Sequence, residues 1–282
     1  MSKVGKVALN YVVVPLICMT AYYFLIAFSL EIVRSLVGAD YLKHDYAIYT
    51  IEGAIGIAIC FVWFHFCEKF GFHKVPHSAG KPEECVYAVV SALAMLGISA
   101  LYFMLISKIK SSFITKSMEK YNDMMTVYNP SAFAVAFNVI SSCILIPILE
   151  EMVFRGIVFE GMLHNGRPVF AVIFSALCFG VMHGQIIQIG YACLAGIALA
   201  MVYYISRNLV MSILAHMVFN FLGNGIFVMF DIPQHIGYIL SLIEYASILV
   251  FIVASVFFLV IRKREKDKKD TGLKIESEGE KG

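Results

Sequence analysis

Charged side chains are scarce in this chain. Asp, Glu, Lys and Arg make up only 15% of its 282 residues, whereas hydrophobic residues make up 60%, and the mean hydropathy is +0.80. Soluble domains of this size carry roughly 25% charged residues. The low charge therefore argues against an ordinary soluble protein and predicts a chain that lies mostly within a membrane.

Cysteine motifs and internal repeats are also lacking. The seven cysteines show no CxxC spacing and lie at or near apolar segments. This pattern gives no sign of a cysteine-rich metal site or a disulfide framework, so we interpret these residues as small apolar packing groups. We find no repeat with a period of roughly 20 to 50 residues.

Eight apolar segments follow one another along the sequence. They occupy residues 8–30, 47–67, 86–106, 131–163, 168–182, 186–205, 209–230 and 236–261. Most reach the ~20 residues that a helix needs to cross the hydrocarbon core. Because the alternating pattern of barrel strands is missing, we predict an all-α polytopic membrane protein with about eight transmembrane helices in a bundle.

The domain organisation follows from these segments. Residues 1–261 are expected to form a single membrane-embedded domain, and residues 262–282, basic and then of mixed charge, a disordered cytoplasmic tail. Lys and Arg beside the first and last segments place both termini in the cytoplasm. The first segment has no evident cleavage site and is expected to be an uncleaved anchor. Residues 108–128 mix Lys with Phe, Ile and Met, which suggests an amphipathic segment along the interface.

The fourth segment is too long for a simple crossing. Its 33 residues would span about 50 Å as a helix, against a hydrocarbon core of ~30 Å. Pro147 is expected to kink this helix and to free backbone groups just before a polar motif.

That first polar motif is Glu150-Glu151 with Arg155. Glu151 and Arg155 are four residues apart, so a helix places them on one face, where pairing lowers the cost of burying both charges. Glu150 lies about 100° around the helix and is free to point elsewhere. Alone, the motif is equally typical of a structural ion pair beside a Glu that reaches towards the interface.

Two further motifs follow in order. Phe179 precedes His183 by one helical turn, and His216 precedes Asn220 by one turn. Residues one turn apart share a face, so His216 and Asn220 bring two hydrogen-bonding groups to one volume. Alone, each motif also fits a packing histidine or an interhelical hydrogen bond. If the three faces meet, the resulting polar cavity suits activation of water and stabilisation of an oxyanion.

The ordered set EExxxR, FxxxH and HxxxN resembles the pattern of the CAAX protease and bacteriocin-processing family (CPBP, also called Abi). These are intramembrane endopeptidases related to the Ras-converting CAAX endopeptidase. The three motifs match without departure at Glu150-Glu151 to Arg155, Phe179 to His183, and His216 to Asn220. The motif-bearing core covers about residues 131–230.

The resemblance implies cleavage of peptide bonds within the membrane. By similarity, Glu150 is the base that deprotonates a water and His183 holds that water. His216 and Asn220 then donate to the developing oxyanion. The supporting residues are Glu151, Arg155 and Phe179.

A zinc-dependent version stays open as the alternative. Glu150, His183 and His216 are a three-ligand set to which zinc would add a water. HExxH is absent, and Asn220 suits an oxyanion better than zinc, so we favour a site with no metal cofactor.

The resemblance also limits the partners. We expect membrane lipids and an apolar or membrane-associated peptide or protein substrate, no nucleic acid, and a bacterial plasma membrane. The sequence does not determine the oligomeric state. The alternative function is non-catalytic, as in a bacteriocin-immunity or scaffold protein with the same fold. A small transporter is a third, against which the lack of repeated halves argues.

Other polar residues lie outside the motifs. Glu52 and Glu244 are deep enough to need partners, and we interpret both as structurally hydrogen-bonded. His183 lies at the end of a short segment, so its depth fits that of Glu150 only if the chain after it is enclosed by protein. We expect Gln185 and Gln188 to line a polar vestibule there.

Overall fold

The computed structural model describes residue 5 and residues 9–70, 75–76, 80–125, 131–163, 167–230 and 232–279, and all regular elements in these ranges are helices. Six helical stretches are long and apolar enough to cross a membrane. They are Leu9–Val37, Tyr46–Lys69, Pro82–Ile106, Ala132–Leu163, Ile186–Ser206 and Gln234–Arg264. Two shorter apolar helices are Pro168–Met182 and Leu209–Gly225. The prediction of an all-α polytopic membrane protein is confirmed.

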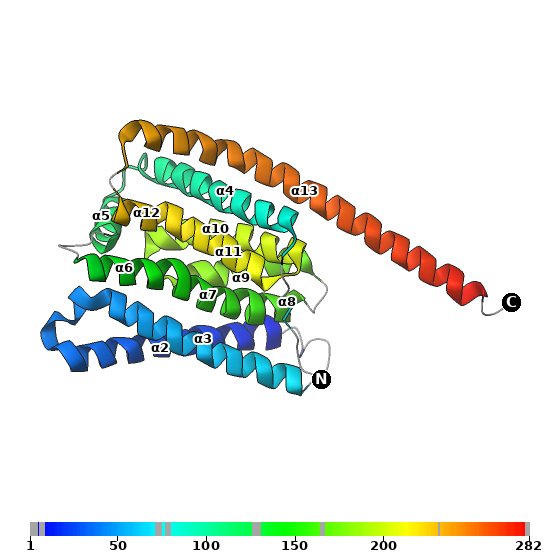
Figure 1. Ribbon diagram of the computed structural model, residues 1–282, viewed down its shortest axis with the longest axis horizontal. Coiled ribbons are helices and arrows are strands. Elements are labelled where there is room, and N and C mark those ends of the chain that lie inside the picture. Colours follow the sequence, from blue (N-terminus) through cyan, green and yellow to red (C-terminus); the bar gives the residue numbers. More distant parts are fainter. Residues whose placement is uncertain are drawn as a thin grey trace.

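The chain begins with a helical hairpin at one side of the bundle (Figure 1). A short π-helix, η1 (Leu9–Val13), leads into α2 (Val14–Val37), and the 3-10 helix η2 (Gly38–His44) connects it to α3 (Asp45–Lys69). η1 and α2 form one continuous helical stretch, Leu9–Val37, with Pro15 at the second position of α2. α2 packs against α3, and α3 packs against the helix that carries the Glu pair.

The opposite side of the bundle is formed by α4 (Pro82–Ile106) and α13 (Gln234–Gly279), which pack against each other. Glu84 accepts the backbone N–H of Lys81 at 3.1 Å and so closes the start of α4. Between α4 and the next long helix lies α5 (Ser112–Met125), within the segment for which we expected an amphipathic stretch.

The fourth predicted segment is a continuous helical stretch from Ala132 to Leu163. It is divided, in order, into α6 (Ala132–Ile140), η3 (Ser141–Leu145), α7 (Ile146–Glu151), η4 (Met152–Phe159) and α8 (Glu160–Leu163). The parts η3 and η4 are π-helical, and they enclose the short α-helical piece that carries both glutamates. π-helical turns inside α-helices are frequent at functional sites.

The centre of the bundle is built from the helices that follow, of which the first and the third carry motif residues. These are α9 (Pro168–Met182), α10 (Ile186–Ser206) and α11 (Leu209–Asn220), which continues into η5 (Phe221–Gly225) and α12 (Ile226–Met229). α10 packs against α9, α4 and α11 and is the most buried of the long helices. The motif side chains therefore project into the interior of the bundle.

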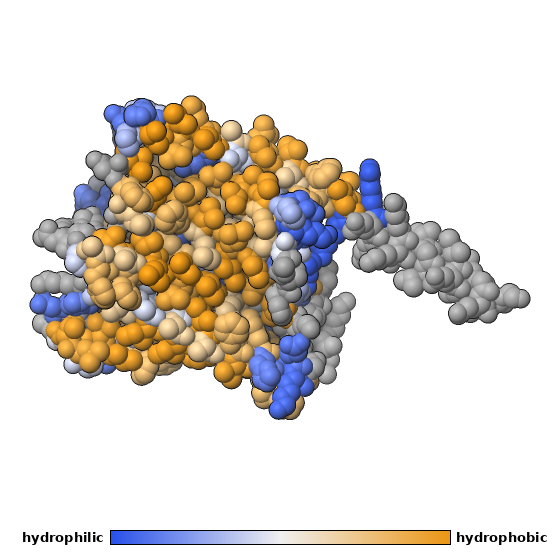
Figure 2. All heavy atoms as spheres, viewed as in Figure 1, coloured by the Kyte–Doolittle hydropathy of each residue, from blue (hydrophilic) through white to orange (hydrophobic). Residues whose placement is uncertain are grey.

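The surface has the distribution expected of a membrane protein. Figure 2 shows a broad apolar band across the viewed face with hydrophilic groups at its two ends. Large side chains such as Phe24, Val169 and Leu242 are 72%, 68% and 69% exposed. Exposed apolar side chains at this density are stable only against lipid.

The C-terminal end differs from our expectation of a disordered tail. α13 continues to Gly279 and projects beyond the bundle (Figure 1). Residues 262–279 are rich in Lys and Glu, which have high helix propensity, so the helix is able to extend past its apolar part.

Candidate active site

Pro147 lies three residues before Glu150 and alters the backbone hydrogen bonding of this helix. The N–H of Ile146 donates to the Ser141 carbonyl, five residues earlier. In this π-helical register the Ser142 carbonyl would accept from residue 147, which is a proline without an N–H. That carbonyl instead accepts a hydrogen bond from Asn220 Nδ2 at 2.9 Å. The predicted release of a backbone group by Pro147 therefore occurs, and a site residue uses it.

Glu151 is the most heavily hydrogen-bonded side chain of the site. Its carboxylate accepts from Arg155 Nη1 at 2.8 Å, from the Ser212 hydroxyl at 2.5 Å and from His216 Nδ1 at 3.0 Å. Glu151 and Arg155 are both fully buried. Since charged groups are costly inside a membrane, three donors on one carboxylate indicate a fixed supporting element.

Phe179 is the ring against which the other side chains stack. The Arg155 guanidinium carbon lies 4.6 Å from its centroid. The ring centroids of His183 and His216 lie 4.9 and 5.7 Å from it, in edge-to-face geometry. Phe179 is 2% exposed. Its ring therefore brings the two imidazoles and the guanidinium together, as expected of a supporting residue, and stabilises the buried cation.

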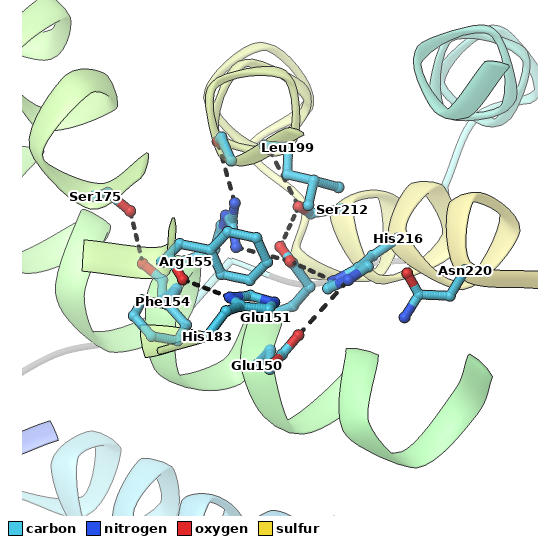
Figure 3. A network of polar contacts seen from close by, with 12 residues as sticks. Glu150, Glu151, Phe154, Arg155, Ser175, His183, Leu199, Ser212, His216 and Asn220 are labelled. Carbon is cyan, nitrogen blue, oxygen red and sulfur yellow. Dashed lines mark hydrogen bonds and ion pairs between the residues drawn. The ribbon is translucent and has the colours of Figure 1, made fainter. Parts of the chain in front are cut away.

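Glu150 faces a different side of the helix from Glu151. Its Oε2 lies 3.6 Å from His216 Nε2, and its Oε1 accepts from the Tyr22 hydroxyl at 3.3 Å. The side chain is buried but makes no short ion pair with Arg155 in the described structure. Figure 3 shows Glu150, His183 and His216 directed towards one region. Glu150 is thus the carboxylate left available by the pairing of its neighbour.

His183 presents one free ring nitrogen. Its Nδ1 lies 2.8 Å from the Phe179 carbonyl oxygen, which only accepts, so Nδ1 carries the hydrogen of that bond and Nε2 remains for other partners. α9 ends directly before His183, and Gly184 adopts a φ of +69° that turns the chain away. Glycine adopts this conformation without the steric cost of a side chain.

The segment after His183 is only partly enclosed by protein, because Gln185 is buried whereas Gly184 and Ile186 are exposed. The Gln185 side chain is buried, accepts the Gln188 N–H at 2.9 Å and donates to the Ser117 carbonyl at 2.9 Å. Gln185 therefore starts α10 and ties it to α5. Our expectation that Gln185 lines a polar vestibule is wrong, because both ends of its side chain are used for packing.

Asn220 is only partly available. One N–H of its amide is used by the Ser142 carbonyl, which leaves a second N–H and the oxygen. His216 is held by Glu151 at Nδ1, so its Nε2 donates only when both ring nitrogens carry protons. Stabilisation of an oxyanion by these two residues remains a prediction.

The described residues contain no preformed set of zinc ligands. Among the described residues, no three His, Cys, Asp or Glu side chains converge closely enough to hold a metal ion. The group Glu150, His183 and His216 is included in that statement. These side chains, as placed, do not fit a three-ligand zinc site, and we derive no step through a metal.

Three residues of the site were not anticipated from the sequence. Ser212 precedes His216 by one helical turn, so its spacing on α11 is a signal that was available. Ser142 contributes a backbone carbonyl, and Tyr22 comes from α2, 128 positions away from Glu150. No local pattern connects either of them to the motifs.

Comparison with known proteins agrees with the motifs. Residues 132–222 match the family described as "Type II CAAX prenyl endopeptidase Rce1-like". A Bacillus subtilis protein named "Putative membrane peptidase YdiL" is 31% identical over 87 residues, which are 31% of this chain and 36% of that relative. The chain thus aligns with about a third of the length of this relative. No solved structure matches. The matched segment contains all three motifs, so this part of the chain is similar to the Rce1-like CAAX protease family.

Proposed function

We propose that the protein is an intramembrane endopeptidase that cleaves a membrane-associated peptide or protein. The observation that carries this proposal is the difference in hydrogen bonding between two adjacent glutamates. Glu151 is saturated by Arg155, Ser212 and His216, whereas Glu150 faces His216 Nε2 at 3.6 Å. A carboxylate that is buried, unsaturated and beside imidazoles is suited to act as a general base.

In the proposed reaction, a water lies between Glu150 and the free Nε2 of His183. Glu150 takes one proton from this water, and the oxygen attacks the peptide carbonyl carbon. When doubly protonated, His216 donates from Nε2 to the oxyanion, together with the remaining N–H of Asn220. The proton on Glu150 passes to the leaving nitrogen as the C–N bond breaks, so the protons balance.

The setting supports a membrane-associated substrate. The site lies inside a bundle whose viewed outer face is apolar (Figure 2), so we expect a substrate that reaches it to come from the bilayer. The basic residues that begin the segment after Ile261 favour cytoplasmic termini, with the protein in a bacterial plasma membrane.

The test compares peptide cleavage by purified variants in liposomes. Glu150→Gln, His183→Ala and His216→Ala should each lower cleavage by roughly a hundredfold or more, the scale of a lost acid–base group. Glu244→Gln, which changes a glutamate on α13 away from the site, is the matched control and should cleave at the wild-type rate. If Glu150→Gln folds and cleaves normally, the proposed function fails. If wild-type protein and Glu150→Gln bind the peptide equally and neither cleaves it, the non-catalytic alternative is correct.

Zinc is tested in the same preparations. We expect activity to survive chelation. Zinc that is stoichiometric in active protein, and whose removal abolishes cleavage, would replace the mechanism above by the metal-dependent one.

A further inference from the structure

A second buried glutamate lies beside the candidate site and belongs to none of the motifs. Glu52 is on α3, is 2% exposed and lies outside the matched segment 132–222. It is coupled electrostatically to Glu150 and to the hydroxyl of Tyr22. Tyr22 is itself 6% exposed. The two carboxyls and the phenol thus form one buried group of titratable side chains in the interior of the bundle.

The helices are built to bring these groups together. A Cβ added to Gly53 would lie 2.7 Å from Leu145 Cβ, and one added to Gly56 would lie 2.5 Å from a methyl carbon of Leu149. The Leu145 Cβ is fixed to the backbone, so glycine at position 53 is needed for α3 to approach the Glu150 helix this closely, whereas the Leu149 methyl lies at the end of a flexible side chain. The approach places Glu52, next to Gly53, at the level of Glu150.

The number of available hydrogens indicates the protonation state of the Glu52 carboxyl. The Tyr22 hydroxyl has one hydrogen to donate, and its hydrogen bond runs to Glu150 Oε1, with 3.3 Å between the two oxygens. An ionised carboxylate only accepts hydrogen bonds, so Glu52 can bond the phenol oxygen only if it brings a proton of its own. Two ionised carboxylates on one phenol would also repel each other strongly in so apolar a site.

We propose that Glu52 is a positioning residue of the site, which holds a protonated carboxyl that donates to Tyr22, while Tyr22 donates to Glu150. This chain fixes the Glu150 carboxylate in the orientation that faces His216. It also keeps the three groups at a single negative charge. The site is then completed by α2 and α3, two helices that the matched segment does not include.

The kinetic test rests on the proposed function. Glu52→Gln supplies an amide N–H to the phenol and mimics the protonated acid, so kcat should stay within about threefold of wild type. Glu52→Ala and Tyr22→Phe release Glu150, and kcat should fall roughly ten- to a hundredfold with little change in KM, because misplacement of a reacting group costs on this scale. Glu244→Ala is the matched control and should be unchanged. Equal impairment of Glu52→Gln and Glu52→Ala, or full activity of Glu52→Ala, overturns the proposal.

A second measurement needs no substrate. Infrared spectra of wild-type protein should contain the C=O stretching band of a protonated carboxyl that shifts in D2O and disappears in Glu52→Gln. A wild-type spectrum without any band that Glu52→Gln removes overturns the proposal. The band is present or absent whether or not the protein cleaves peptides, so failure of this inference is distinguished from failure of the proposed function.

Discussion

Removing one charge of the Glu151–Arg155 pair should destabilise the fold more than removing both. The two side chains are fully buried and 2.8 Å apart. Breaking a buried pair by deleting one partner costs roughly 3–5 kcal/mol, because the other charge is left without compensation. Replacing both by apolar residues of similar volume is often nearly neutral.

The structure also predicts which single variant suffers more. In Glu151→Leu, the Arg155 guanidinium keeps only the Gly196 carbonyl at 3.1 Å and the Phe179 ring as described partners. In Arg155→Leu, the Glu151 carboxylate keeps two donors, Ser212 and His216. Glu151→Leu should therefore lie near ~5 kcal/mol and Arg155→Leu near ~3 kcal/mol, the two ends of the range for a broken buried pair.

The assay is thermal unfolding in detergent with a dye that fluoresces on reacting with thiols. Cys60, Cys67 and Cys143 are 5%, 5% and 2% exposed and become reactive only when the bundle opens. A loss of this size lowers the Tm by roughly 6–20 °C in a domain of this order of size. The double variant Glu151→Leu/Arg155→Leu should melt above Glu151→Leu. A double variant that melts below both single variants, or single variants that melt with wild type, would refute the reasoning.

Three further changes test the packing around the site. Ser212→Ala removes the 2.5 Å donor to Glu151 and should cost about 1–3 kcal/mol, measured by the same unfolding assay; an unchanged Tm would show that this bond adds nothing. Gly180→Ala would place a Cβ 2.1 Å from Cys193 Sγ and should cost about 1–3 kcal/mol, part of which Cys193→Ala restores; no recovery in the double variant contradicts this cause. Phe179→Leu removes the ring beneath Arg155 and should lower both the Tm and the cleavage rate, and a variant as active and stable as wild type would assign Phe179 to simple core packing.

Local spacing predicted much of the fold and of the site. The apolar segments anticipated the helices because a membrane admits few other structures, and the i,i+4 spacing anticipated the pair of Glu151 with Arg155. The freeing of a carbonyl by Pro147 was also local, since it follows from the missing N–H of one residue.

Contacts between distant helices were beyond such reasoning. Tyr22 and Glu52 approach Glu150 only because α2 and α3 pack against its helix, and no spacing in the sequence encodes that register. Gln185 was misinterpreted for the same reason, because its acceptor is a carbonyl of α5, 68 positions earlier. The prediction of a disordered C-terminal tail was based on composition and burial and did not consider helix propensity, so it did not anticipate the extension of α13 to Gly279.

The hydrogen bond between Asn220 and residue 142 has a genetic consequence. Its acceptor is a main-chain oxygen that is available because residue 147 is a proline, so no change of side chain at position 142 removes it. A screen for loss of function should therefore recover substitutions at Asn220 and at Pro147. Substitutions at Ser142 should not be recovered through loss of this hydrogen bond. Changes at Asn220 and at Pro147, which lie on different helices, should then give the same defect. The atom that connects them is the main-chain carbonyl oxygen of residue 142, which every amino acid possesses.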